Sequence, residues 1–369
     1  MAQEEEIDGI ENLDQQILRR YDIIQKIGKG AYGIVFRARD KQTDQVVALK
    51  KVFGAFQNAT DAQRTYREIT FLRQLRSHPF IVGLIAVHRA ENDGDLYLVF
   101  EIMETDVHAV IRANILLDVH HRYIFWQLLC ALKYIHSAGL IHRDLKPSNI
   151  LIRSDASIKV CDFGLSRAVN EEGSCEQLTD YIATRWYRAP EILFGSCSYG
   201  IGIDMWAAGC ILAELVSGRP LFPGASTMDQ LERIVSYSGP PSQSDIDAMQ
   251  SSFTQTMLSN LSYSRPRMKL EEKLSGASPD AIDLVKKLIS FNPADRPTAE
   301  ECLKHPYVAQ FHNEKKEIEA PEKIYMALPD SQHFTAREYR NQIYKEAIKE
   351  QDTKRKAMQK NKHEHAADD

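Results

Sequence analysis

The residues most capable of chemistry lie close together in the middle of the chain, between positions 142 and 191. His142-Arg143-Asp144 is followed, five residues after the aspartate, by Asn149, and Asp162-Phe163-Gly164 comes after a short apolar run. These residue types suit phosphoryl transfer, which depends on positioning and charge neutralisation more than on covalent help. Asp144 can accept the proton of an attacking hydroxyl, and Lys146 can reach a moving phosphate from the same side of an extended loop. Asn149 and Asp162 supply the hard oxygen ligands that Mg²⁺ prefers.

Each of these motifs is weak by itself, because a lone His-Arg-Asp is usually an exposed loop and a lone aspartate usually belongs to a cap or a turn. Their order and close spacing, ended by Ala189-Pro190-Glu191, make chance a poor explanation. The stretch therefore predicts a site in which two carboxylates, an amide and a lysine act together.

A glycine-rich stretch, Gly28-Lys29-Gly30-Ala31-Tyr32-Gly33-Ile34-Val35, lies between segments that read as strands. The G-x-G-x-x-G pattern alone could open a dinucleotide-binding fold, but that fold requires a helix directly after the glycines. Residues 34–39 read as a strand instead. They favour a glycine-rich hairpin, whose backbone N–H groups can approach phosphates without interference from a Cβ atom.

Lys50 lies near the end of the apolar strand 46–51, and Glu68 is its candidate counter-ion. Residues 61–76 have helical spacing, with large apolar residues on one face and Glu68 among them. An isolated glutamate on a helix is usually a solvated residue, but Lys50 needs a counter-ion to hold its direction. Strand alternation turns Lys51 to the opposite face, where we expect an exposed, solubilising charge.

Together these motifs resemble the catalytic loop, metal-binding turn and activation segment of the eukaryotic protein kinases. Thr179-Asp180-Tyr181, ahead of Ala183-Thr184-Arg185-Trp186-Tyr187-Arg188, narrows the resemblance to the dual phosphorylation lip of the MAP kinases, over residues 21–309. Phe100, the 219–224 and 239–241 stretches and Glu338-Tyr339-Arg340-Asn341 resemble the atypical extracellular-signal-regulated kinases of the seven/eight type. That branch usually has Glu where this chain has Asp180.

The resemblance implies a bilobal α+β protein-kinase fold that binds ATP and Mg²⁺. Lys50 would clamp phosphate, Asp144 would act as the base, and Lys146 and Thr184 would support it, with Asn149 and Asp162 holding metal. Adenine would bond to the Glu101 carbonyl and the Met103 amide, with Phe100 behind it. The residues assigned to the nucleotide are Gly28, Lys29, Gly30, Ala31, Tyr32, Gly33, Val35, Ala48, Lys50, Phe100, Glu101, Met103, Asn149, Leu151, Cys161 and Asp162.

The resemblance also implies a phosphorylation switch at Thr179 and Tyr181, operated by an upstream kinase or by the protein itself. A phosphate adds roughly −1.5 to −2 charges and several acceptors, so clustered arginines would read it. By resemblance these are Arg67, Arg143 and Arg167 for Thr179, and Arg185 and Arg188 for Tyr181. The resulting pocket would select Pro after the Ser or Thr that is phosphorylated. Structural support is expected from Glu191 paired with Arg296 and from Asp204 on the catalytic-loop backbone.

Two other classes of function are weighed against this interpretation. A pseudokinase scaffold predicts the loss of Lys50, Asp144 or Asp162, and all three are present. A kinase of small molecules has no use for the Thr179-Asp180-Tyr181 lip. We therefore expect a proline-directed Ser/Thr kinase with protein substrates, regulators and phosphatases as partners, and a monomer.

Composition limits the remaining possibilities. The 369 residues carry a formal net charge of −5, which gives no sign of nucleic-acid binding. The acidic N-terminus has no signal-peptide core, and no apolar run reaches membrane-spanning length. Six scattered cysteines fit a reducing compartment, with neither disulfides nor zinc. We expect a cytoplasmic protein; the family resemblance adds the nucleus, cytoskeleton and cilium.

The chain divides into five expected regions. Residues 1–20 are an extension that docks on the first lobe, 21–103 the N-lobe and hinge, and 104–309 the C-lobe, with an activation segment over 162–191 and an insert near 240–279. Residues 310–350 are an extension packing back on the kinase, helical over 336–350, and 351–369 a disordered charged tail. Helices are predicted over 118–138, 205–237 and 278–304. The adjacent His120-His121 point in different directions on a helix, which argues against a metal site.

Overall fold

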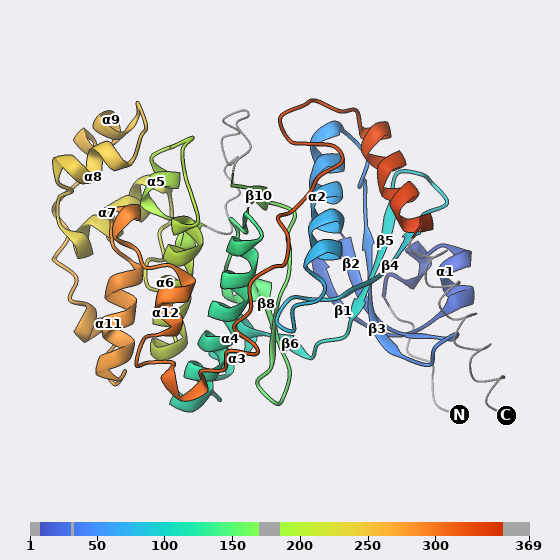
Figure 1. Ribbon diagram of the computed structural model, residues 1–369, viewed down its shortest axis with the longest axis horizontal. Helices are drawn as coiled ribbons and strands as arrows, with labels where there is room; N and C mark the ends of the chain where they lie inside the picture. The colour runs from blue at the N-terminus through green and yellow to red at the C-terminus, as the bar shows by residue number, and fades with distance from the viewer. Residues whose placement is uncertain (1–7, 31–32, 170–184, 350–369) are drawn as a thin grey trace. The chain divides into compact units, whose positions relative to one another are not determined.

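The computed structural model describes residues 8–30, 33–169 and 185–349, which fold into two compact units (Figure 1). Unit one comprises the described residues of Met1–Arg76, Val82–Met103 and Gln332–Asp369. Unit two comprises those of Ser77–Ile81 and Glu104–Ser331. Unit one is built on a β-sheet and unit two is mainly helical, which confirms the predicted α+β class.

Unit one contains a five-stranded antiparallel sheet with strand order β1-β2-β3-β5-β4. The strands are β1 (Tyr21–Gly30), β2 (Gly33–Asp40), β3 (Val46–Val52), β4 (Leu84–Arg89) and β5 (Leu96–Glu101). Successive side chains of a strand point to opposite faces, so Phe36 and Leu49 enter the core while Val35, Ala48 and Lys50 share the other face. The glycine-rich stretch is the β1–β2 hairpin, as predicted.

The N-terminal extension packs on the core face of this sheet, as expected. It forms η1 (Ile10–Asn12) and α1 (Gln15–Arg20), and buries Leu13 and Ile17 in the same cluster as Phe36. Burying two aliphatic side chains in this way contributes about 1.5–3 kcal/mol each. The contact fixes the extension to the strands that carry the glycines and Lys50.

The expectation of an exposed Lys51 is wrong. Lys51 does point to the opposite face from Lys50, but that face is covered by the extension, and the residue is only 5% exposed. Its Nζ donates to the Asn12 carbonyl at 2.5 Å and lies 3.6 Å from Asp14 and 3.3 Å from Asp95. Charged groups are almost never fully buried unless they are paired, and Lys51 meets that requirement through these partners.

Helix α2 (Ala59–Leu75) realises the predicted 61–76 helix and begins at Asn58, whose side chain accepts from the Asp61 amide. Residues 336–349 are also helical and lie beside it, as Figure 1 shows in red. The rings of Tyr66 and Tyr339 are 5.4 Å apart, and Arg73 pairs with Glu346 at 3.2 Å. The C-terminal extension therefore packs on α2, and its tail from 350 onward lies outside the described residues.

Unit two is organised around two buried helices, α4 (Asp118–Ser137) and α6 (Gly202–Ser217), which pack against each other. The predicted 118–138 helix is confirmed. His120 accepts from the Leu117 amide at 3.0 Å and so caps the start of α4. Among the described residues, no three His, Cys, Asp or Glu side chains could together hold a metal ion.

The other elements of unit two are shorter than predicted. The 205–237 region is two helices, because Gly218 ends α6 with a φ of 71° and prolines occupy positions 220 and 223. The 278–304 region is likewise divided, by the loop that carries Pro293 and Pro297. The insert contains short helices of its own. The elements are α3 (Val107–Ala113), α5 (Pro190–Leu193), α7 (Thr227–Ser238), α8 (Gln243–Ala248), α9 (Thr254–Ser259), α10 (Leu270–Lys273), α11 (Pro279–Leu288), α12 (Ala299–Leu303), η2 (Pro147–Asn149), η3 (Arg185–Tyr187), η4 (Pro293–Asp295), η5 (Ala309–Phe311), β6 (Thr105–Asp106), β7 (Leu140–Ile141), β8 (Ile150–Ile152), β9 (Ile158–Val160) and β10 (Arg167–Ala168).

Two compositional expectations have different outcomes. No helix in the described part of the chain combines the length and apolar character needed to cross a membrane. Cys130, Cys161, Cys210 and Cys302 are free, but Cys197 is disulfide-bonded, so the prediction of no disulfide is wrong for that residue. Spacing along the chain does not report which sulfur atoms meet in space.

Candidate active site

The glycine-rich hairpin is closed by the pairing of Gly30 with Gly33. A Cβ atom on Gly33 would lie 2.2 Å from the Lys51 carbonyl oxygen, so only glycine lets β2 approach β3 this closely. A Cβ on Gly30 would meet no atom within 4 Å. The sequence predicts that both glycines contact phosphate. The packing of β2 on β3 requires glycine at position 33 whether or not phosphate is bound. Ala31 and Tyr32 lie outside the described residues.

Lys50 forms the predicted ion pair with Glu68. The Lys50 Nζ to Glu68 Oε1 distance is 2.9 Å, and both side chains are partly buried. In register, Lys50 lies opposite Val35 on β2, and Ala48 lies opposite Phe100 on β5. Directly opposite residues of antiparallel strands share a face, so the sheet collects Val35, Ala48, Lys50 and Phe100 on one face.

The end of β5 leads to the other predicted nucleotide contacts of unit one. Glu101 accepts from the Gly83 amide through Oε1 at 2.7 Å, and its own amide donates to the Gly83 carbonyl at 3.1 Å. These bonds fix the backbone of Glu101 and bind its side chain to the Gly83 amide. Met103, two residues further, is buried and is the last residue of this stretch in unit one.

In unit two, Asp144 has two of its predicted companions in direct contact. Lys146 Nζ lies 2.8 Å from Asp144 Oδ2. The Asn149 amide donates to Asp144 twice, to its carbonyl at 2.9 Å and to Oδ2 at 3.2 Å. The carboxylate is thus aimed by an ammonium and an amide, an arrangement that suits a group which must accept a proton at a fixed position.

The backbone around Asp144 is held by a buried carboxylate, as predicted for Asp204. Asp204 accepts from the amides of His142 at 2.8 Å and Arg143 at 2.9 Å, and from His136 Nε2 at 2.9 Å. Arg143 has a φ of 69°, which is uncommon for a residue with a Cβ atom. Burial would raise the pKa of Asp204, but its bond with His136 and the nearby His142 lower that pKa below its ordinary value. Asp204 is therefore a charged anchor for a strained loop.

Asn149 and Asp162 fit the magnesium prediction. The Asn149 amide nitrogen is turned to Asp144, so its Oδ1 is the atom that would ligate a cation. The Cys161 amide donates to the Asn149 carbonyl at 3.0 Å, which brings Asp162, the next residue, near Asn149. Mg²⁺ in such sites is commonly held by one or two carboxylates together with substrate phosphates. Leu151 follows on β8, and buried Phe163 packs against His142 at 4.9 Å.

The arginines of the predicted switch are distributed over both units. Arg67 lies on α2 in unit one, whereas Arg143 donates to the Leu165 carbonyl at 3.2 Å and Arg185 to the Ala225 carbonyl at 3.0 Å. Arg188 begins the loop into α5. The residues they would serve, Thr179 and Tyr181, lie outside the described residues, as does Thr184.

Arg167 has a partner that sequence reasoning missed. Its Nη1 lies 2.9 Å from Asp330 Oδ2, and the two side chains are 15% and 8% exposed. Asp330 belongs to the C-terminal extension, 163 residues away along the chain, and no local signal marks it. Arg167, which the resemblance assigns to a phosphate on Thr179, is therefore already paired with the carboxylate of Asp330.

The segment after the lip is anchored from several sides. Trp186 Nε1 donates to the Gly224 carbonyl at 3.0 Å, and the Tyr187 hydroxyl donates to Glu214 at 2.6 Å. Burial and the Glu214 carboxylate raise the pKa of Tyr187, so it stays a neutral donor. The predicted pair of Glu191 and Arg296 is bidentate, at 2.6 and 2.9 Å, and almost completely buried.

Comparison with known proteins places this chain among kinases. Residues 21–308 match the family model described as "Protein kinase domain". The chain is 54% identical over 350 residues to "Extracellular signal-regulated kinase 2" of Dictyostelium discoideum, covering 94% of this chain and 95% of that protein. It is 49% identical over 337 residues to "Mitogen-activated protein kinase 15" of Xenopus laevis and 48% identical over 342 residues to "Extracellular signal-regulated kinase 7" of Drosophila melanogaster. These matches cover 90% and 91% of this chain but only 57% and 37% of those two longer proteins.

Proposed function

The chain belongs to the protein kinase family and, within it, to the MAP kinases, and on this premise we propose that it phosphorylates Ser or Thr followed by Pro in other proteins. It is a Ser/Thr protein kinase, and kinases of this family use ATP with Mg²⁺. Nothing in the chain favours a pseudokinase. The proposal rests chiefly on one observation, the contact of Asp144 with both Lys146 and Asn149.

Each site residue described above in unit two then has a role in the transfer. Asp144 accepts the proton of the substrate hydroxyl as that oxygen attacks the γ-phosphorus of ATP, and the bond from that phosphorus to the bridging β–γ oxygen breaks to release ADP. Lys146, 2.8 Å from Asp144, stabilises negative charge on the moving phosphoryl group. Asp204 keeps the loop in the conformation that aims Asp144. Asn149 and Asp162 would hold Mg²⁺, which when bound neutralises phosphate charge.

Unit one contributes the phosphate clamp. Glu68 holds the Lys50 ammonium at 2.9 Å, so that Lys50 can donate to phosphate oxygens from a fixed direction. The open backbone around Gly30 provides N–H groups for the same anion. Val35, Ala48 and Phe100 supply an apolar surface for adenine, and Glu101 and Met103 its main-chain partners.

Regulation follows from the lip residues. We assign Thr179 and Tyr181 as phosphorylation sites, modified by an upstream kinase or by the protein itself. A phosphate on Thr179 would recruit Arg143 and Arg167 in unit two, and Arg67 through α2. Because Asp330 already pairs with Arg167, that phosphate would have to share or displace this carboxylate. Regulators and phosphatases are the expected partners, acting on a monomer in the cytoplasm, with the nucleus, cytoskeleton and cilium as further compartments.

Two experiments test the proposal. Initial rates on a Ser-Pro peptide and on its Ser-Ala counterpart should differ by at least tenfold, and equal rates would refute proline direction. The purified protein and an Asp162→Asn variant, each incubated with ATP, should then be compared by mass spectrometry at Thr179 and Tyr181. Phosphate in the intact protein alone supports self-activation, whereas phosphate in neither indicates an upstream enzyme.

A further inference from the structure

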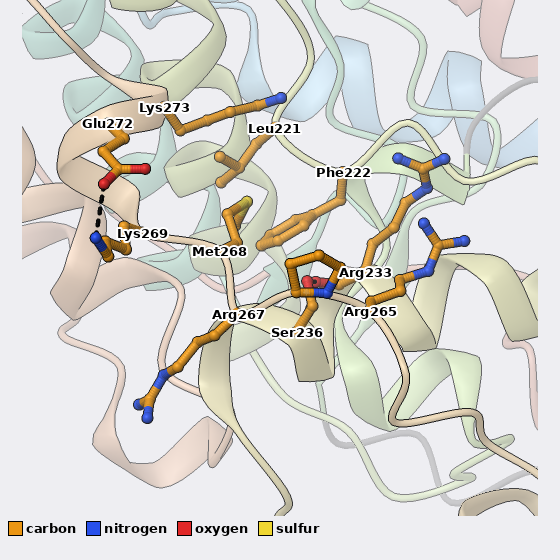
Figure 2. A pocket seen from close by; sticks show the side chains of 11 residues that line it. Leu221, Phe222, Arg233, Ser236, Arg265, Arg267, Met268, Lys269, Glu272 and Lys273 are labelled. Atoms are coloured by element: carbon orange, nitrogen blue, oxygen red, sulfur yellow. Dashed lines mark hydrogen bonds and ion pairs between the residues drawn. The ribbon is translucent and has the colours of Figure 1, made fainter.

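Unit two contains a pocket of about 450 Å³ that has no role in the transfer reaction described above. It lies between the loop before α7, the α7 helix and the segment from 265 to the end of α10 (Figure 2). Its floor is apolar and is made by Leu221, Phe222 and Met268. Leu221 and Phe222 are only 4% and 1% exposed, so they line the hollow without projecting from it.

Positive side chains surround this floor, together with the carboxylate of Glu272. Figure 2 shows the apolar side chains near the centre and the charged ends around them. The chain as a whole carries a net charge of −5, so the rim is a local excess of positive charge on an acidic protein. We call this site the basic pocket and define it by its rim cations, which are Arg233, Arg265, Arg267, Lys269 and Lys273.

The rim cations differ in how far their charge is already neutralised. Arg233 pairs with Asp229 at 3.0 Å, Arg265 pairs with Asp229 and Glu232, and Lys269 pairs with Glu272 at 2.8 Å. Arg267 and Lys273 are exposed, and neither is ion-paired with another residue in the described part of the chain. Arg267 and Lys273 can therefore pair with a ligand without first breaking another ion pair.

The floor of the basic pocket is connected to Trp186, in the segment that follows the lip. The Gly224 carbonyl, two residues after Phe222, accepts from Trp186 at 3.0 Å, and Gln230 donates to the Trp186 carbonyl at 3.3 Å. A Cβ atom on Gly224 would lie 2.4 Å from Gln230, so this connection is tightly packed. A ligand in the basic pocket therefore rests on the loop that supports the segment following the lip.

From these features we propose that the basic pocket docks an acidic peptide segment of the protein substrate. In such a segment carboxylates or phosphoserines flank one apolar side chain. The apolar side chain would pack chiefly on the partly exposed Met268, above the buried Leu221 and Phe222. The anionic groups would pair with Arg267 and Lys273. The proposal deepens the protein-kinase function proposed above and rests on it for the identity of the partner as a substrate.

A membrane surface fits the basic pocket less well. Membrane-binding surfaces insert apolar side chains into the headgroup region, whereas Leu221 and Phe222 lie at the bottom of a hollow and cannot reach lipid. An extended peptide can send a single side chain into such a hollow and leave its neighbours at the rim. The concave, apolar floor with a charged rim therefore favours a peptide.

The direct test is fluorescence anisotropy with a fluorescein-labelled peptide, Glu-Asp-Phe-Asp-Glu, titrated with the full chain. We expect saturable binding that the Arg267→Ala/Lys273→Ala double variant weakens about tenfold, since an exposed ion pair contributes a few-fold each. Raising the salt from about 0.1 M to about 1 M, which shortens the Debye length from about 10 Å to about 3 Å, should weaken it as well. The Lys304→Ala/Lys345→Ala variant removes two exposed lysines elsewhere and should bind like the intact protein.

Further arms identify the ligand. A phosphoserine version of the peptide that binds more tightly, by the same rim, indicates a phosphorylated segment, and equal binding indicates carboxylates. Binding of the charge-reversed peptide Lys-Arg-Phe-Arg-Lys in preference to the acidic one would overturn the proposal. So would no peptide binding, binding that is unchanged in the Arg267→Ala/Lys273→Ala variant, or binding only to vesicles of phosphatidylcholine and phosphatidylserine.

A kinetic measurement separates docking from catalysis. A Ser-Pro peptide extended by the acidic segment should show a lower KM than the Ser-Pro peptide alone in the intact protein, with the same kcat. The Arg267→Ala/Lys273→Ala variant should lose that KM advantage. If neither peptide is phosphorylated, the kinase function has failed, and the anisotropy result still decides whether the basic pocket binds acidic peptides.

Discussion

Asp204→Asn should slow phosphoryl transfer without removing any group that touches substrate. The carboxylate accepts three hydrogen bonds, two of them from the amides of His142 and Arg143. An asparagine offers one oxygen, so at least one of these buried donors would face an NH₂ group. Hydrogen bonds to a charged group contribute about 1.5–3 kcal/mol each, and a donor left unsatisfied costs a similar amount.

This loss is comparable with the strain that the loop stores. Arg143 is held at a φ of 69°, and a left-handed backbone costs an L-residue roughly 1–2 kcal/mol. Without the full anchor, Arg143 is free to relax and carry Asp144 away from its working position. If the substitution destabilises the working conformation of the loop by about 2 kcal/mol relative to the relaxed one, the population of the working conformation, and hence kcat, falls about thirtyfold.

The assay combines kcat on a Ser-Pro peptide at saturating ATP with urea unfolding of the same samples. Leu284→Ala, at a fully buried position of α11, is the matched control, because a core truncation of this kind costs about 2–5 kcal/mol without touching the loop. We expect both variants to lose stability and only Asp204→Asn to lose kcat at a temperature where both are folded. Equal kcat in the intact protein and in Asp204→Asn would refute the reasoning.

The same substitution should change the response to acid. The pKa of Asp204 is lowered in the folded protein, so its contribution to stability is present above the unfolded value of about 3.9 and is lost as the pH falls through the folded value. The intact protein should therefore lose stability more steeply than Asp204→Asn as the pH falls below about 4. Unfolding free energies measured across this range in both proteins check the sign.

Other substitutions test the remaining parts of the two units. Lys50→Met should lower kcat/KM for the Ser-Pro peptide at least about a hundredfold, because the phosphates lose a preorganised cation; activity near that of the intact protein would contradict the role of Lys50. Arg296→Met should destabilise the fold by about 3–5 kcal/mol in urea unfolding, since it leaves the Glu191 charge buried. The double variant Arg296→Met/Glu191→Leu should recover much of that loss, and no recovery would show that the pair is not the cause. Lys51→Met should cost about 2 kcal/mol, clearly more than Lys41→Met at an exposed pair, and equal costs would mean that the buried position of Lys51 has no weight.

Much of the fold and of the catalytic group could be predicted because the informative signals are local. Strand alternation separated Lys50 from Lys51, and a run of eight residues contains Asp144, Lys146 and Asn149. What covers each face is not local. The partners of Lys51 and Arg167 lie 39 and 163 residues away, in the N-terminal and C-terminal extensions, where nothing about Asn12 or Asp330 distinguishes them from surface residues.

The basic pocket shows a second limit of sequence reasoning. Its rim cations come from α7 and from the 265–273 segment, and in the sequence they read as an ordinary mixture of charges in a polar insert. Only the fold brings these residues around one hollow, with Phe222 at its floor. Likewise the sequence predicts helix throughout 205–237, because the apolar run of α6 masks the stop that Gly218 imposes.

Unit one takes its residues from both ends of the chain, and this arrangement matters for biosynthesis. A ribosome releases the polypeptide from the N-terminus onward, so every residue of 104–331 emerges before the 336–349 helix that covers Tyr66 on α2. Throughout that interval the nascent β-sheet unit exposes an aromatic face with no cover. We therefore expect the newborn chain to be a substrate for chaperones until the 336–349 helix has been translated.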